Sequence, residues 1–237
     1  MNVVIRLGGF HIAQNFMGCI GFYMKNSGIE EILAESEVCK RGTANKVIDG
    51  KDYYKMVRCH SLVSEAMSGL IWSTFEGWLE SEDQLDLLED LSDHLNILLD
   101  ALETTDSQAA NSHIKDVKVD LKGLLPMWID FVETLGVTAN FWLMYIEMVQ
   151  VLKRYIHAER AGLWQEHIQE VQNMLPFIVS AQHMTNMTCL PLYLNNIRAL
   201  LDEHPYVYEN FMKGHFTVHR RQGNFNGVWT YGPGANL

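Results

Sequence analysis

Proline, paired cysteines and long apolar runs are scarce in this chain of 237 residues. With five prolines, 48% hydrophobic residues and 20% charged residues, the composition is typical of a globular protein and excludes an intrinsically disordered one. The apolar stretch 134–146 is too short to span a bilayer. Residues 1–14 are interrupted by Arg6 and His11 and have no small-residue cleavage site after them, so they do not resemble a signal peptide. We therefore expect a soluble, intracellular protein without a membrane segment.

The four cysteines stand far apart, at positions 19, 39, 59 and 189. No two of them have the C-x-x-C spacing that zinc sites and thiol redox sites use. Since nothing in the sequence indicates secretion, we expect four reduced thiols and no disulfide framework.

Metal-ligand and nucleophile motifs are also missing. The sequence contains no H-E-x-x-H helix, no Glu-x-x-His pair of a di-iron bundle, no G-x-S-x-G elbow and no glycine-rich phosphate loop. The nearest approach to a metal site is Asp90 with His94, four residues apart and beside Asp93. Because a metal site needs further ligands, this pair alone is more typical of a chance spacing. The sequence predicts no metal and no cofactor.

A turn from a strand into a helix is predicted near the beginning of the chain. Residues 3–5 are β-branched and favour a short strand, and Gly8 with Gly9 would allow a tight turn into a helix. A helix start after a strand can also hold an anion, but two glycines do not cradle a phosphate by themselves. His11 is the single candidate catalytic residue, because α/β folds place their chemistry at strand ends. A core histidine with a satisfied hydrogen bond is the alternative interpretation.

Acidic charge is concentrated in one segment. The formal net charge is −11, and eleven acids but no Lys or Arg lie between Glu76 and Asp106, which leaves 18 acids and 18 bases elsewhere. Such a segment repels phosphate, so nucleic acid is not an expected partner, and a solvated helix surface is its common meaning. The basic triplet 219–221 is too small for a nucleic-acid surface and is typical of a strand edge protected by charge.

Helical periodicity dominates the rest of the chain. Apolar residues recur every three or four positions over 10–24 and 52–79, and the leucines at 88, 91, 95, 98 and 102 follow the spacing of a helix-bundle seam. Further helices are expected over 29–38, 43–48, 114–124, 138–162, 164–181, 190–201 and 204–214. We expect kinks or breaks at Pro126 and Pro176, Pro191 in the first turn of its helix, and Gly214 at the end of the last helix. Alternation after residue 216 suggests a hairpin over 216–231. The predicted fold class is mainly α: a multi-helix array with a short N-terminal strand and a candidate C-terminal β-hairpin, in one domain over residues 1–237.

Three blocks of the sequence carry a family resemblance: VVIRLGGFHIAQNFMGCIG, HSLVSEAM and LPLYLNNIRALLDEHPYVYENFMKGHFTVHRRQGNFNGVW. In this order they resemble a family of large uncharacterised proteins that look transposon-derived, and the resemblance spans nearly the whole chain. The resemblance implies a recombinase core of the RNase H-like kind with a helical insertion. Carboxylates from separate segments would then hold two metal ions on a phosphodiester.

The chain departs from that family where carboxylates are expected. Relatives carry an Asp-containing segment before the L-G-G-F-H block and an acidic, Glu-containing motif after the V-W block, where this chain reads TYGPGANL. A central pattern of Asp-His-x-Asn character is replaced by AQHMTN at residues 181–186. The resemblance therefore implies a remnant without catalytic activity, and it predicts that the chain is a fragment of a longer reading frame.

Two functions from different classes follow from these observations. The preferred prediction is a catalytically inactive remnant of a mobile-element protein. The alternative is a helical module for protein–protein interaction or scaffolding, which would bind a protein partner or a second copy through apolar helix faces left uncovered. A metal-dependent helical-bundle enzyme is a third possibility, which elemental analysis of the purified protein would test.

Overall fold

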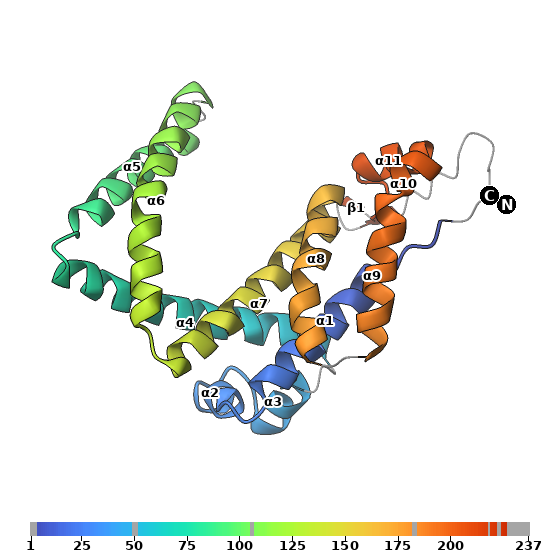
Figure 1. Ribbon diagram of the computed structural model, residues 1–237, viewed down its shortest axis with the longest axis horizontal. Coiled ribbons are helices and arrows are strands. Elements are labelled where there is room, and N and C mark those ends of the chain that lie inside the picture. Colours follow the sequence, from blue (N-terminus) through green and yellow to red (C-terminus); the bar gives the residue numbers. More distant parts are fainter. Residues whose placement is uncertain are drawn as a thin grey trace. The chain divides into compact units, whose positions relative to one another are not determined.

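The computed structural model describes residues 4–48, 52–104, 107–181, 184–217, 219–221 and 224–226, and these residues are mainly helical (Figure 1). The prediction of a mainly α fold is therefore confirmed. The helices of the described residues are α1 (Gly9–Met24), α2 (Ile29–Glu35), α3 (Arg41–Ile48), α4 (Tyr53–Ser81), α5 (Asp86–Glu103), α6 (Ser107–Thr134), α7 (Val137–Ala161), α8 (Trp164–Ser180), α9 (Met184–Arg198), α10 (Leu200–Glu203) and α11 (Pro205–Met212).

The chain divides into two compact units. Unit 1 comprises Met1–Ser64 and Tyr145–Leu237, and unit 2 comprises Glu65–Met144. Both boundaries fall inside helices, one within α4 and the other within α7. That the two units form one domain, as the sequence predicts, stays a prediction.

Unit 1 is built around the buried face of α1. This helix packs against α3 and α8, and α8 packs in turn against α9 and α11. The residues of α1 that the periodicity assigns to one face are buried, namely Ile12, Ala13, Phe16, Met17, Ile20 and Met24. Gly21 lies directly against the backbone of Ile48, so a β-carbon at this position would overlap the carbonyl group. The close approach of α1 to the end of α3 thus requires glycine.

Unit 2 contains an antiparallel hairpin of α5 and α6, together with the C-terminal part of α4 (Figure 1). Its core is formed by residues at helical spacing on each element, namely Phe75, Leu79, Leu91, Val117, Leu124 and Phe131. Phe75 lies edge-on to Trp128 and tilted to Phe131, each with ring centroids 5.2 Å apart. These aromatic contacts join α4 to α6.

The predicted N-terminal strand is wrong for Val4 and Ile5, which lie in a segment without secondary structure, while Val3 lies outside the described residues. A β-branched run forms a strand only where another strand supplies its backbone partners. Here Ile5 is 75% exposed, and the segment is held instead through its neighbour Arg6. Gly8 and Gly9 therefore lead from an irregular segment, not from a strand, into α1.

Near the other end, His219–Arg221 (β1) and Asn224–Asn226 (β2) pair antiparallel, with Arg220 opposite Phe225. The hairpin predicted over 216–231 is not reproduced at that length. Phe216 and Thr217 precede the ladder, and residues 227–231 lie outside the described residues.

Three prolines lie inside helices where the sequence suggested a kink, a break or a first turn. Helix α6 does not restart at Pro126, and α8 continues through Pro176. Pro191 was expected in the first turn of a helix, but α9 begins seven residues earlier, at Met184. Each proline removes one backbone donor, and tertiary packing tolerates this loss. Within the described residues, no helix has both the length and the apolar character that a membrane crossing requires.

Candidate functional site

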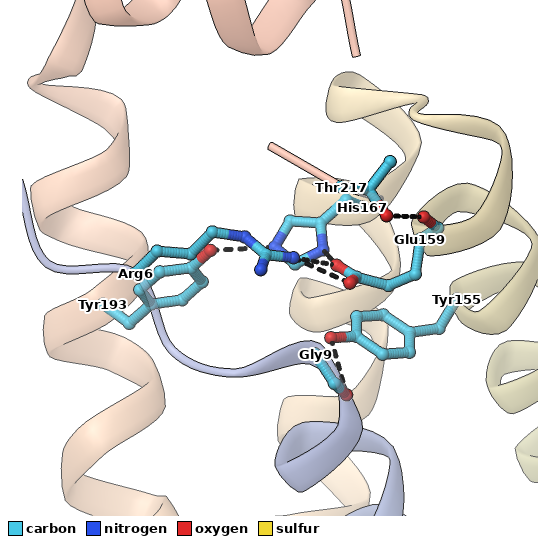
Figure 2. Close-up of polar contacts among 7 residues, drawn as sticks. All are labelled: Arg6, Gly9, Tyr155, Glu159, His167, Tyr193 and Thr217. Carbon is cyan, nitrogen blue, oxygen red and sulfur yellow. Dashed lines mark hydrogen bonds and ion pairs between the residues drawn. The ribbon is translucent and has the colours of Figure 1, made fainter. Parts of the chain in front are cut away.

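The carboxylate of Glu159, near the end of α7, is the centre of a polar cluster in unit 1 (Figure 2). Arg6 donates from Nη2 to both oxygens of Glu159, at 2.5 Å to Oε1 and 2.7 Å to Oε2. Nδ1 of His167, on α8, lies 2.6 Å from Oε1 of the same carboxylate. One acid thus joins the segment before α1 to two helices that are more than 150 positions away from Arg6 in the sequence.

A tyrosine completes this chain of contacts. The hydroxyl of Tyr193, on α9, lies 2.8 Å from Nε2 of His167. Because Nδ1 is in contact with a carboxylate, we assign the proton of a neutral imidazole to Nδ1. Nε2 is then the acceptor, and the Tyr193 hydroxyl donates to it. We call Arg6, Glu159, His167 and Tyr193 the latch.

The latch lies in a protected environment. His167 has no exposed surface and Tyr193 is 4% exposed. Burial tends to raise the pKa of Glu159, but the hydrogen bond from His167 and the charge and hydrogen bond of Arg6 outweigh it, so this pKa lies below its ordinary value. Burial lowers the pKa of His167, although Glu159 opposes the shift. We therefore assign an ionised glutamate beside a neutral histidine.

Aromatic rings of α8 and of the segment after α11 pack against the latch. Trp164 stacks on His167, with ring centroids 5.0 Å apart and planes inclined by 6°. Phe216 contacts Trp164 at 4.9 Å, and the guanidinium carbon of Arg6 lies 5.1 Å from the centre of the Phe216 ring. Such rings exclude water and strengthen the electrostatic attraction within the cluster.

Contacts of Gly9 and Thr217 set the geometry around Glu159. A β-carbon at Gly9 would overlap the Glu159 carboxylate, so the second glycine of the L-G-G-F-H block provides the room for this acid. The carbonyl of Gly9 accepts a hydrogen bond of 3.3 Å from Tyr155 (Figure 2). Thr217 Oγ1 donates to the backbone carbonyl of Glu159 at 2.5 Å. The start of α1 and the segment after α11 are therefore both tied to the end of α7.

The latch has the composition of an acid–base site but the geometry of a structural connection. A carboxylate next to a histidine is the orienting pair of many hydrolases. A general base must, however, reach a substrate proton, and both ring nitrogens of His167 already contact other side chains. The arrangement is suited to holding four segments together.

His11, the candidate catalytic residue from the sequence, lies outside the latch. It is exposed on α1, and its ring lies edge-on to Phe10 with centroids 5.7 Å apart. Its position two residues after Gly9 did point to the correct region of the chain. Within this region, Gly9 and Arg6 contact Glu159, whereas His11 does not take part in the latch.

Asp90 and His94, the candidate metal ligands, lie on α5 in unit 2. His94 directs Nδ1 to Oδ2 of Asp120 on α6, at 2.7 Å, and Asp90 is exposed. The hydrogen bond to Asp120 raises the pKa of His94, and the neighbouring acids add to this effect. Over the described residues, no group of three or more His, Cys, Asp or Glu side chains is arranged to hold a metal ion.

A second feature of unit 2 is an exposed apolar surface on the helical hairpin. We call it the hairpin face. It consists of side chains that are each between 39% and 56% exposed, namely Leu95, Leu99 and Leu102 on α5 and Leu121, Leu125 and Ile129 on α6. On each helix these residues are spaced by three or four positions, so they lie along one side of it.

The latch could not be predicted from the sequence. Its residues have no fixed spacing, and 187 positions separate the first from the last. The hairpin face could be predicted only in part. The sequence indicates a helix-bundle seam that includes the leucines at 95 and 102, but helical spacing does not distinguish the buried leucines from the exposed ones.

Comparison with known proteins adds a family but no activity. A family model described as "Domain of unknown function (DUF8702)" matches residues 1–231. No curated protein and no solved structure matches the chain.

Proposed function

Because the chain belongs to the family described as a domain of unknown function (DUF8702), we propose a function from its own residues: it is a non-catalytic helical module that binds protein through the hairpin face. Unit 1 then serves as a base whose segments the latch holds together. The observation that carries this proposal is the row of six half-exposed Leu and Ile side chains along α5 and α6.

The closed latch supports the non-catalytic part of the proposal. Its carboxylate accepts hydrogen bonds from Arg6 and lies against Nδ1 of His167, and the imidazole is stacked on Trp164. Opening this site to a substrate would break an ion pair and expose an aromatic cluster. In unit 2, His94 contacts Asp120, and the described residues contain no group of three His, Cys, Asp or Glu side chains arranged to hold a metal ion.

The number and spacing of the exposed side chains on the hairpin face support binding. Isolated exposed leucines are common, but a continuous patch of several such residues marks an interaction surface in soluble proteins. Burying the exposed half of six aliphatic side chains would contribute about 6 kcal/mol. This is of the same order as the loss of translational and rotational freedom on association, so polar contacts around the face are also needed for a stable complex.

Site-specific photo-crosslinking tests the proposal. A photoreactive phenylalanine derivative is placed at Leu99 or at Leu125 in the full chain, which is then irradiated in cells that express it. We expect discrete adducts of higher mass, because both positions lie within the hairpin face. Matched controls carry the same group at Ile97 or Val119, which are 45% and 66% exposed on other sides of the same helices.

Adducts at the two face positions, with weak or different adducts at the control positions, support the proposal. If the face positions form no adducts, or if all four positions give the same pattern, the hairpin face does not bind protein and the proposal fails.

The origin from a mobile element and the loss of its nuclease activity stay predictions. The departure from the family pattern at residues 181–186 motivates them. Incubation of the purified chain with labelled DNA and Mg²⁺ or Mn²⁺ tests the loss of activity. Cleavage above a metal-free control would contradict both this prediction and the non-catalytic function.

A further inference from the structure

Two cysteines of unit 1 that lie twenty positions apart in the sequence meet in the structure. Cys39 lies in the bend between α2 and α3, and Cys59 lies on α4. Their side chains are hydrogen-bonded to each other. No short spacing in the sequence indicates this pair, because helix packing brings the two thiols together.

The backbone on both sides of the contact is tied to the core of unit 1. Glu37, with a φ of +57°, lies in the turn after α2. The backbone N–H of Cys39 then donates to the carbonyl of Leu33, a fully buried residue of α2, at 3.1 Å. Cys59 follows the fully buried Met56 by one helical turn and is itself 3% exposed. The packing of α2 and α4 therefore places both thiols.

The two thiols differ in their access to solvent. Cys39 is half-buried, whereas Cys59 is buried. A small molecule from solution therefore meets Cys39 first, and it can react with Cys59 only through this neighbour. An accessible thiol beside a shielded one is the arrangement of an attacking and a resolving cysteine.

We propose that Cys39 and Cys59 are a redox pair, which a low-molecular-weight disulfide such as glutathione disulfide converts into an intramolecular disulfide. Oxidation would replace the hydrogen bond between the thiols by a covalent bond of about 2.05 Å. It would thereby join the connection between α2 and α3 to α4. The inference goes beyond the proposed function and is independent of the hairpin face, since both cysteines lie in unit 1.

The oxidation consists of two thiol–disulfide exchanges. The Cys39 thiolate first attacks one sulfur of glutathione disulfide, so that a bond between Cys39 and glutathione forms and one glutathione thiolate leaves. The Cys59 thiolate then attacks the Cys39 sulfur and expels the second glutathione thiolate. In total, the two protein thiols lose two electrons and two protons, and glutathione disulfide is reduced to two molecules of glutathione that take up both.

The contact between the thiols favours this order of steps. Burial raises the pKa of Cys59, and the charge of a Cys39 thiolate and the hydrogen bond donated to it raise this pKa further. Cys59 therefore keeps its proton while Cys39 attacks. Once the Cys39 sulfur is bound to glutathione it has no charge, so both effects of Cys39 on the Cys59 pKa disappear. Cys59 then loses its proton more readily, and the charge of Arg58 favours its thiolate.

Oxidation of the purified full chain with glutathione disulfide tests the proposal. Free thiols are then blocked with N-ethylmaleimide, and proteolytic peptides are identified by mass spectrometry. We expect peptides joined through Cys39 and Cys59, with Cys19 still a free thiol. Cys59→Ser should instead leave glutathione bound to Cys39, and the matched variant Cys189→Ser should retain the bridge. The inference is overturned if glutathione stays on Cys39 of the wild type while Cys59 remains a free thiol.

Urea unfolding shows whether the native structure forms the bridge, and it needs no variant. Closing the loop from Cys39 to Cys59 should lower the unfolding equilibrium constant by about a hundredfold, and dithiothreitol should reverse this change. The rate of oxidation should be the same with and without urea at concentrations far below the unfolding midpoint. An oxidised chain no more stable than the reduced one, or a bridge that forms only where urea unfolds the chain, would overturn the inference.

Discussion

The carboxylate of Glu159 fills the space that any side chain at Gly9 would need. This relationship links the first turn of α1 to the end of α7, and it explains why a residue with low helix propensity occupies the start of a helix. Arg6 and His167 contact the same carboxylate. Moving the acid aside would therefore break these contacts.

Substitution of Gly9 by alanine should destabilise unit 1 by about 2–4 kcal/mol, because the new methyl group displaces a partly buried ion pair. Gly18 provides a matched control in the same helix, since nothing lies within 4 Å of a β-carbon built there. Gly18→Ala should be neutral or stabilise the protein by up to about 1 kcal/mol through helix propensity. Urea unfolding measures both variants, and equal stabilities would contradict the proposed packing of Glu159.

Removal of one member of the ion pair should be more harmful than removal of both. Arg6→Met should destabilise the protein by about 2–3 kcal/mol, because it leaves Glu159 charged and largely buried. Glu159→Gln keeps the shape of the side chain and should lessen this effect when the two substitutions are combined. We expect a coupling energy of at least about 1 kcal/mol in a double-mutant cycle of denaturant unfolding. Strictly additive effects would show that the two groups do not interact.

His60 should make the stability of unit 1 depend on pH. Burial lowers the pKa of this histidine to about 4, and its Nδ1 lies 3.0 Å from the Tyr145 hydroxyl. Between about pH 6.5 and pH 4 the unfolded chain therefore binds a proton that the folded chain does not, so stability falls as pH falls. The loss attributable to His60 is roughly 3 kcal/mol over this range.

The variant His60→Gln retains an amide that can donate to Tyr145 and has no group that titrates in this range. Its free energy of unfolding, measured by denaturant titration at several pH values, should fall less steeply from pH 6.5 to pH 4 than that of the wild type. Parallel pH profiles for the two proteins would contradict the assignment.

The thiols should differ widely in their reactivity. Cys189 is exposed, whereas Cys19 and Cys59 are buried, and burial raises their pKa to about 12 and about 11. Since the thiolate is the reactive form, a colorimetric thiol reagent near neutral pH should modify Cys189 rapidly and the two buried thiols only after unfolding. Cys39 should react at an intermediate rate. Rapid reaction of Cys19 in the native protein would contradict its placement in the core of unit 1.

The sequence by itself determined the helical class and much of the face assignment of individual helices. The spacing of Ile12, Phe16, Met17 and Ile20 predicted the buried side of α1, because helical periodicity is a local property of about four residues. Gly214 was expected to close the last helix, and its φ of +81° after α11 fits that role. Charge could also be predicted locally, since the described acids of the run lie on exposed positions of α4, of α5 and of the turn between them, apart from the half-buried Glu76.

Tertiary structure alone decided where the N-terminal segment goes and which polar residues meet. β-Propensity predicted a strand at Val4 and Ile5, but the ion pair of Arg6 with Glu159 determines the path of that segment. The contact of His94 with Asp120 likewise depends on the pairing of two helices, and not on the i, i+4 spacing from Asp90. Local periodicity reports which side of a helix avoids water, whereas polar partners distant in the sequence are selected by the packing that brings their helices together.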